Sequence, residues 1–190
     1  HIVSKWRDKN KIKQQCSVYY LEELINSSRG CGTPSDIEEH LTPECIMFTS
    51  GSTGFPKGVC LDRKSFDSSI KAWNEKINFN TKDNYILCLP VSHIAGLSVL
   101  YRAIYHHFRI TIIDDYRTLS AETGSVISLV PTMLNRIIEK KINTENLSSY
   151  RAIILGGEHA DIRLLQHCLK NNMNIFVSYG MTETCSGISG

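Results

Sequence analysis

Residues 49–58 read Thr-Ser-Gly-Ser-Thr-Gly-Phe-Pro-Lys-Gly and follow a short apolar run that begins at Cys45. Glycines let the backbone turn tightly and direct its N–H groups at an anion, while the hydroxyls add neutral donors. The lysine adds one mobile positive charge. A plain flexible linker between two strands would need neither the lysine nor the proline. We therefore predict a loop that wraps a polyphosphate through Thr49, Ser50, Gly51, Ser52, Thr53, Gly54 and Lys57.

This loop differs from the phosphate loop of the common nucleoside triphosphatases, which has glycine before its lysine and serine or threonine after it. Here Pro56 precedes Lys57, and Gly58 follows it. Because proline disfavours helical geometry in the residue before it, we expect a hairpin that continues into a strand at 58–62. No helix N-terminus then faces the phosphates, so side chains and local backbone must bind them.

The chain beyond residue 44 alternates short apolar runs, rich in valine and isoleucine, with segments of helical periodicity. We expect strands at 45–49, 58–62, 85–89, 109–113, 126–130, 152–155 and 175–178, and helices at 65–77, 94–107, 131–141 and 161–171. Pro131 suits a first helical position, and Asp161 suits a helix cap. This alternation predicts an α/β fold with a largely parallel sheet flanked by helices, with an α+β arrangement as the alternative.

Residues 1–42 differ from the rest of the chain. They contain one strand-helix candidate at 18–26 and then a surface connection at 28–42. We therefore predict two parts: an N-terminal strand-helix unit with its connection at 1–42, and a nucleotide-binding core at 43–190. Because the chain starts at His1 and stops at Gly190 directly after a motif-rich segment, we expect a fragment of a longer protein.

A second polar segment, Tyr-Gly-Met-Thr-Glu-Thr at 179–184, follows the last expected strand. Sheet enzymes bind ligands at the carboxyl ends of strands. There an aromatic ring offers a stacking face, a hydroxyl can bond a phosphate oxygen, and a carboxylate can hold magnesium. The segment therefore predicts a second part of the nucleotide site. The alternative is an ordinary polar turn.

Two further segments follow strand ends. Gly156, Gly157 and Glu158 come after the strand at 152–155, where paired glycines permit close approach of a flat ligand. A turn that needs glycine for its own geometry is the alternative. His93 follows the strand at 85–89 and opens a long apolar helix, a position where a lone histidine is most often structural.

Composition restricts the function. The chain has 42% hydrophobic and 21% charged residues and a net charge of +2, a balance that gives no reason to expect nucleic-acid binding or membrane insertion. Its seven cysteines form no C-x-x-C pair, so we expect reduced, buried thiols in a cytoplasmic protein and no zinc site.

The loop at 49–58 resembles the signature loop of the adenylate-forming superfamily of acyl-CoA synthetases, peptide-synthetase adenylation domains and beetle luciferases. The resemblance implies the large N-terminal domain of a ligase that uses ATP, Mg²⁺ and coenzyme A and forms an acyl-AMP. It implies that Tyr179, Gly180, Met181 and Thr182 meet the nucleotide, that Gly156, Gly157 and Glu158 lie against adenine and the acyl pocket, and that Glu183 holds the metal. The implied catalytic residues are Lys57, His93, Thr182 and Glu183, with His93 beside the carboxylate substrate.

Within the superfamily, the runs at 89–102, 128–134 and 178–186 look most like the o-succinylbenzoate–CoA ligases of menaquinone biosynthesis. Another acyl- or aryl-CoA ligase and a non-catalytic nucleotide-binding remnant are the alternatives. Arg102 then has two readings: it meets a second carboxylate of a dicarboxylic substrate, or it forms a structural ion pair. The family's hinge and small C-terminal domain are missing from these residues, so we expect the fragment alone to catalyse poorly. The sequence leaves a homodimer open.

Overall fold

The computed structural model describes residues 44–49, 57–119, 124–140 and 147–189. Its centre is a five-stranded sheet in which every neighbouring pair is parallel. The strands lie in the order β4 (Arg109–Ile112), β3 (Asn84–Leu87), β5 (Val126–Leu129), β6 (Ala152–Leu155) and β7 (Ile175–Val177). The chain leaves β3 for one edge and returns past it to β5, so the strand order reverses between these two strands.

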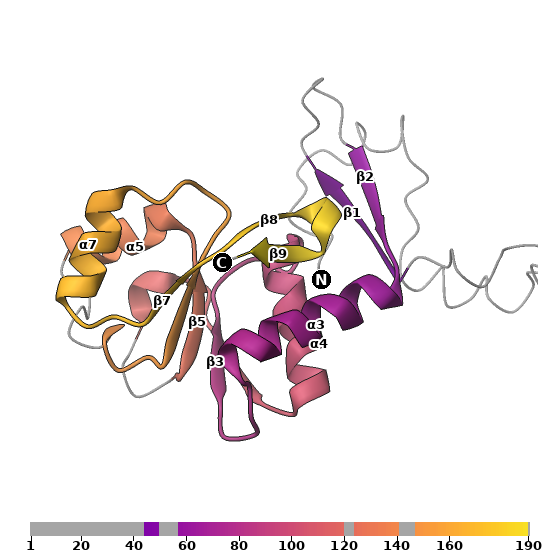
Figure 1. The fold of residues 1–190 in the computed structure, drawn as a ribbon, viewed down its shortest axis with the longest axis horizontal. Helices are drawn as coiled ribbons and strands as arrows, with labels where there is room; N and C mark the ends of the chain where they lie inside the picture. Colours follow the sequence, from indigo (N-terminus) through magenta and orange to yellow (C-terminus); the bar gives the residue numbers. More distant parts are fainter. Residues whose placement is uncertain (1–43, 50–56, 120–123, 141–146, 190) are drawn as a thin grey trace, which may run out of the picture. The chain divides into compact units, whose positions relative to one another are not determined.

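Helices cover both faces of this sheet, as Figure 1 shows: α3 (Arg63–Ile77) and α4 (Ile94–His106) on one side, and α5 (Pro131–Glu139) and α7 (Ile162–Lys170) on the other. Successive strand residues point to opposite faces. Tyr85 and Leu87 accordingly pack in the cluster under α3 and α4, whereas Ile86 packs in the cluster under α5 and α7. Burial on both faces explains why the central strands β3, β5 and β6 consist mostly of apolar residues.

Two antiparallel hairpins stand beside the sheet. The first pairs β1 (Cys45–Thr49) with β2 (Lys57–Leu61), with Thr49 opposite Lys57. The second pairs β8 (Tyr179–Met181) with β9 (Ser186–Ser189), and the short 3-10 helix η3 (Thr182–Thr184) lies between its strands. Another 3-10 turn, η1, spans Tyr116–Thr118.

The strand starts are tied together by a polar network below the sheet. Arg151 donates to the Asp83 carboxylate and, through Nη1, to the Ile77 carbonyl at 2.6 Å. The Ser125 hydroxyl donates to Asp83 Oδ1 at 2.8 Å. Burial raises the pKa of Asp83, but hydrogen bonds from Arg151, the Asn80 backbone and Ser125 outweigh it, so that this pKa lies below its usual value.

The α/β prediction is confirmed: all seven expected strands and all four expected helices lie within two residues of their predicted bounds. Pro131 begins α5, and Asp161 caps α7 by accepting a hydrogen bond from the Arg163 backbone at 2.7 Å. The hairpin predicted around Pro56 is present as β1 and β2. The sequence reading did not anticipate the hairpin of β8 and β9. The unit predicted for 1–42 and the loop residues 50–56 lie outside the described residues.

Candidate active site

A cleft of about 720 Å³ opens where the strand order reverses, at the carboxyl ends of β3, β5 and β6. This is the position at which open α/β sheets bind ligands. The cleft brings together residues from every segment singled out in the sequence. Among its lining residues are Thr49, Leu89, Pro90, His93, Val130, Met133, Gly156, Gly157, Gly180, Met181, Thr182 and Glu183.

The phosphate-loop hairpin reaches this cleft through Thr49, the last residue of β1. Its hydroxyl donates to the Lys57 carbonyl across the hairpin at 3.4 Å. The exposed Lys57 is opposite Thr49 but is not part of the cleft lining. The intervening Ser50, Gly51, Ser52, Thr53 and Gly54 lie outside the described residues, so their phosphate-binding role stays a prediction.

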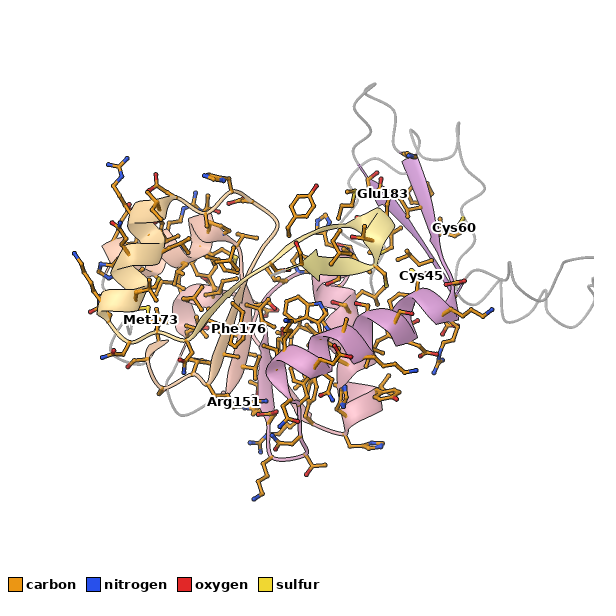
Figure 2. The ribbon with its side chains drawn as sticks, viewed as in Figure 1. Cys45, Cys60, Arg151, Met173, Phe176 and Glu183 are labelled. Carbon is orange, nitrogen blue, oxygen red and sulfur yellow. The ribbon has the colours of Figure 1, made fainter. Side chains whose placement is uncertain are left out.

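Thr182 and Glu183 enter the cleft on η3, at the tip of the hairpin of β8 and β9. Thr184 stabilises this turn: its hydroxyl accepts from the Met181 N–H at 3.0 Å and lies 2.8 Å from the Ser186 carbonyl, to which it can donate. Cys185 then adopts a left-handed conformation (φ 52°) with its side chain buried. The turn thereby holds the Thr182 hydroxyl and the Glu183 carboxylate on the cleft wall. Figure 2 shows Glu183 projecting from this turn.

One small hydrophobic cluster joins these segments. It consists of Met47, Val59, Leu61, Phe66, Ile94 and Cys185. Its members come from the first hairpin, from α3, from the residue after His93 and from the residue after η3. We call this group the junction cluster. Through it, the hairpin that carries Thr49 packs next to η3.

His93 is the N-cap residue of α4, and its own side chain makes no capping hydrogen bond. Its backbone N–H donates to the Pro90 carbonyl at 3.0 Å, which closes the turn after β3. The side chain is exposed and borders the cleft. The imidazole makes no capping hydrogen bond and borders the cleft, where it is available to a ligand, and the role of His93 beside a substrate stays a prediction.

The glycine pair after β6 fits both interpretations of the sequence: a turn that needs glycine for its own geometry, and a close approach of a ligand. Gly157 has a φ of +83°, which other residues rarely adopt, so the turn itself requires glycine here. Both Gly156 and Gly157 also line the cleft. Glu158 points elsewhere, because its carboxylate accepts from the Thr132 N–H and the Thr132 hydroxyl, each at 3.3 Å. It stabilises the first turn of α5 and is not among the lining residues of the cleft.

Tyr179 is 63% exposed and is not among the cleft-lining residues, whereas its neighbours Ser178 and Gly180 are. An exposed ring beside the cleft retains a free face for stacking. The adenine-stacking role of Tyr179 therefore stays a prediction.

The base of the cleft holds polar residues that the sequence reading did not assign to the site, apart from Arg102. Arg102 is 2% exposed, and its Nη2 donates to Ser186 Oγ at 3.0 Å. Its guanidinium carbon lies 4.8 Å from the centre of the Trp73 ring. None of the ion pairs among the described residues includes Arg102, so a structural ion pair finds no support there. Burial lowers the pKa of Arg102, but arginine remains charged in proteins.

Ser128, on β5, lies beside it in the cleft lining, and its hydroxyl is 2.5 Å from the Tyr85 hydroxyl. The sequence signal that could have identified Ser128 is its place in the apolar run Val-Ile-Ser-Leu. A polar side chain in a buried strand needs a hydrogen-bond partner. Trp73 carried no such signal, since a tryptophan on the apolar side of a helix reads as core.

The described thiols do not form a nucleophilic centre. Cys45, Cys60, Cys88, Cys168 and Cys185 are all free, and Cys60 is exposed, unlike the buried thiols expected from the sequence. Cys45 and Cys60 lie on the two strands of the first hairpin (Figure 2). Burial raises the pKa of Cys88 to about 12 and that of Cys185 to about 11, which leaves both as neutral thiols.

Glu183 fits the magnesium role assigned to it. Its carboxylate is exposed, lines the cleft and forms no ion pair among the described residues. The described residues contain no group of three potential metal ligands. Magnesium beside a nucleotide is held by one or two carboxylates together with phosphate oxygens, so a single acidic residue suffices. Within the described residues, no helix combines the length and hydropathy needed to cross a membrane.

Comparison with known proteins agrees with this geometry. The AMP-binding enzyme family matches residues 3–190. The 2-succinylbenzoate–CoA ligase of Bacillus cytotoxicus is 30% identical over 181 residues, which are 92% of this chain and 38% of that protein. The chain thus spans well under half the length of the curated relatives it matches.

Solved structures give the same result. The o-succinylbenzoate coenzyme A synthetase of Bacillus subtilis in complex with its acyl-adenylate intermediate superposes with a TM-score of 0.72 and 28% identity, over 95% of this chain and 38% of the other. The same enzyme with ATP and magnesium gives a TM-score of 0.68 and 31% identity, over 80% and 34% of the two chains. With a parallel α/β core, a cleft at its switch point and a family match along nearly its whole length, this chain belongs to the AMP-binding enzyme family.

Proposed function

We propose that the protein containing this chain is an ATP-dependent acid–thiol ligase that activates o-succinylbenzoate to its acyl-AMP and transfers the acyl group to coenzyme A. The substrate assignment rests on Arg102, whose buried charge is unpaired among the described residues. This residue places an uncompensated positive charge at the base of the cleft, where a dicarboxylic acid would leave its second carboxylate after presenting the first one to ATP. The similarity to succinylbenzoate–CoA ligases supports the same class of acid.

The residues on the cleft wall fit the first half-reaction. Attack of a carboxylate oxygen on the α-phosphate breaks the bond to the β-phosphate and releases pyrophosphate. It brings two anions together, so positive charge and hydrogen-bond donors must act where negative charge develops. Lys57 and the loop at 50–54 would face the β- and γ-phosphates, and Thr182 would donate to the α-phosphate. Glu183 would hold magnesium, which screens the phosphate charge when bound. His93 would border the substrate carboxylate.

Acid-dependent AMP release by the complete gene product tests this proposal. It should require ATP, Mg²⁺ and coenzyme A and should be fastest with o-succinylbenzoate in a panel that includes benzoate and octanoate. A preference for benzoate or octanoate would reassign the protein to another group of acyl- or aryl-CoA ligases. Binding of ATP without AMP release for any acid would favour a non-catalytic nucleotide-binding protein.

We also propose a cytoplasmic location, supported by the free thiols of the five described cysteines. A homodimer is the assembly we propose to test, by light scattering on the complete gene product. A protein of this composition should not retard duplex DNA in a gel at physiological salt.

A further inference from the structure

The buried guanidinium of Arg102 lacks the partner that such a group usually has. A buried charge is normally paired with an opposite charge. Among the described residues, Arg102 donates to the neutral Ser186 hydroxyl and interacts with the neutral Tyr85 hydroxyl, and Arg102 Nε has no partner. The side chain nevertheless lines the cleft. Its positive charge is therefore not cancelled by the fold.

The group that lies against this guanidinium is the indole of Trp73. The distance from Arg102 Cζ to the ring centre is 4.8 Å, within the range of a cation–π contact. Trp73 comes from α3, is 9% exposed and also lines the cleft. Its Nε1–H, which can only donate, has no partner either.

The packing leaves the indole little freedom. A side chain at position 187 would place its Cβ 2.3 Å from Ser178 Oγ and 2.7 Å from Trp73 Cζ2, so only glycine leaves room for the indole. Gly187 and Ser186, which bonds Arg102, are neighbours on β9. The tryptophan and the arginine are thus positioned by the same strand.

An aromatic partner differs from a carboxylate in its effect on charge. A carboxylate would orient the guanidinium and neutralise it, whereas a ring orients it and leaves its charge available. Arg102 and Trp73, which both line the cleft, each also retain one buried N–H donor without a partner within the described part of the chain. Both require an acceptor, and the charge favours an anionic one.

We propose that Trp73 is a positioning residue for substrate specificity: it holds the Arg102 guanidinium in place for the second carboxylate of a dicarboxylic acid. This inference rests on the proposed function. It predicts that Trp73 contributes to the preference for acids with two carboxylates and contributes little to the binding of acids with one.

Calorimetry on the complete gene product tests this role without requiring turnover. The ligands are o-succinylbenzoate and its two singly acidic counterparts, 4-oxo-4-phenylbutanoate and 2-butanoylbenzoate. Trp73→Leu should weaken binding of the diacid about tenfold, the size expected for losing a desolvated cation–π contact, and should leave the tighter-binding monoacid within about twofold. Trp73→Phe, which retains an aromatic face, should recover part of the loss.

Phe79→Leu is the matched control. Phe79 belongs to the same hydrophobic cluster as Trp73 and also loses an aromatic ring, but it does not line the cleft. It should leave the ratio of the two dissociation constants unchanged. If Trp73→Leu does not fold, the ratio of the diacid and monoacid dissociation constants measured for Trp73→Phe tests the inference instead.

Two results would overturn the inference: equal weakening of diacid and monoacid in the Trp73 variants, or a wild-type protein that binds the diacid no more tightly than the monoacid. Acid-dependent AMP release, measured in parallel, tests the proposed function separately. An inactive protein that still shows the Trp73-dependent preference would contradict the ligase and retain the inference.

Discussion

The Tyr85 hydroxyl lies 2.5 Å from Ser128 Oγ, in a hydrogen bond that connects the two strands on either side of the reversal in strand order. Tyr85 is fully buried, and Ser128 faces the cleft. Tyr85→Phe should lower the free energy of unfolding by about 1 kcal/mol, because it removes one buried hydrogen bond. Urea denaturation of Tyr85→Phe, Ser128→Ala and the double variant measures the coupling. Additive losses would show that the two hydroxyls do not interact.

Removing the charge of Arg102 should reduce affinity for a dicarboxylic acid. Arg102→Ala should raise the KM for o-succinylbenzoate by about tenfold to a hundredfold, the value of one hydrogen-bonded charge, with a smaller effect on KM for ATP. Arg102→Lys retains the charge but lacks the planar guanidinium, so its KM for o-succinylbenzoate should lie between the values for wild type and Arg102→Ala. Unchanged kinetics in Arg102→Ala would remove this residue from the site.

Loss of the Glu183 carboxylate should change the metal requirement. Glu183→Gln should raise the Mg²⁺ concentration for half-maximal AMP release by about tenfold or more, because the only exposed carboxylate assigned to the metal is lost. Glu158→Gln is the control, since that carboxylate bonds Thr132 outside the cleft. An identical magnesium titration for Glu183→Gln and wild type would exclude the metal role.

Gly157→Ala should destabilise the turn after β6. A φ of +83° places an alanine side chain in a strained conformation, which costs about 1–2 kcal/mol. Gly58→Ala is the comparison, because a Cβ there meets only ordinary contacts at 3.5 Å and no unusual φ is required. Thermal unfolding of both variants makes the measurement. A stable Gly157→Ala protein would mean that the turn relaxes to another geometry.

Acid should weaken the network at the strand starts. Because the pKa of Asp83 is lowered in the folded state, the stabilisation is present above the unfolded-state pKa of about 3.9 and is lost as pH falls through the lower folded value. Unfolding free energies measured from pH 6 downward should therefore fall less steeply in Asp83→Asn than in wild type. Asp114→Asn, which changes an exposed aspartate, should follow the wild-type slope.

Local signals carried most of the fold. Strands buried on both faces appear as continuous apolar runs, and Pro131 and Asp161 mark their helix starts through φ restriction and capping. The hairpin of β8 and β9 was missed because its strands are short, and the pattern Tyr-Gly-Met lacks an apolar alternation. Its geometry depends on Thr184 and on the left-handed Cys185, neither of which is a usual turn signal.

For the site, the sequence supplied the residues on strand ends and loops but not those brought in by packing. Thr49, His93, Thr182 and Glu183 were predicted and share the cleft. Trp73 was not predicted, because a tryptophan on the apolar side of a helix has the pattern of a core residue. Glu158 was assigned to the ligand, yet its carboxylate bonds Thr132, a contact between α5 and the turn after β6 that one sequence does not reveal.

The junction cluster has a consequence for how a nucleotide would bind in the cleft. Met47, Ile94 and Cys185 lie within two residues of Thr49, His93 and Glu183, and they belong to one hydrophobic cluster. A substitution that shortens any one of these three side chains should therefore displace all the neighbouring polar groups. Affinity for phosphate, carboxylate and metal should then fall together in the same variant. Because the cluster already holds the three segments together, a nucleotide would lose little binding energy to ordering them. More of its binding energy would then position the reacting atoms.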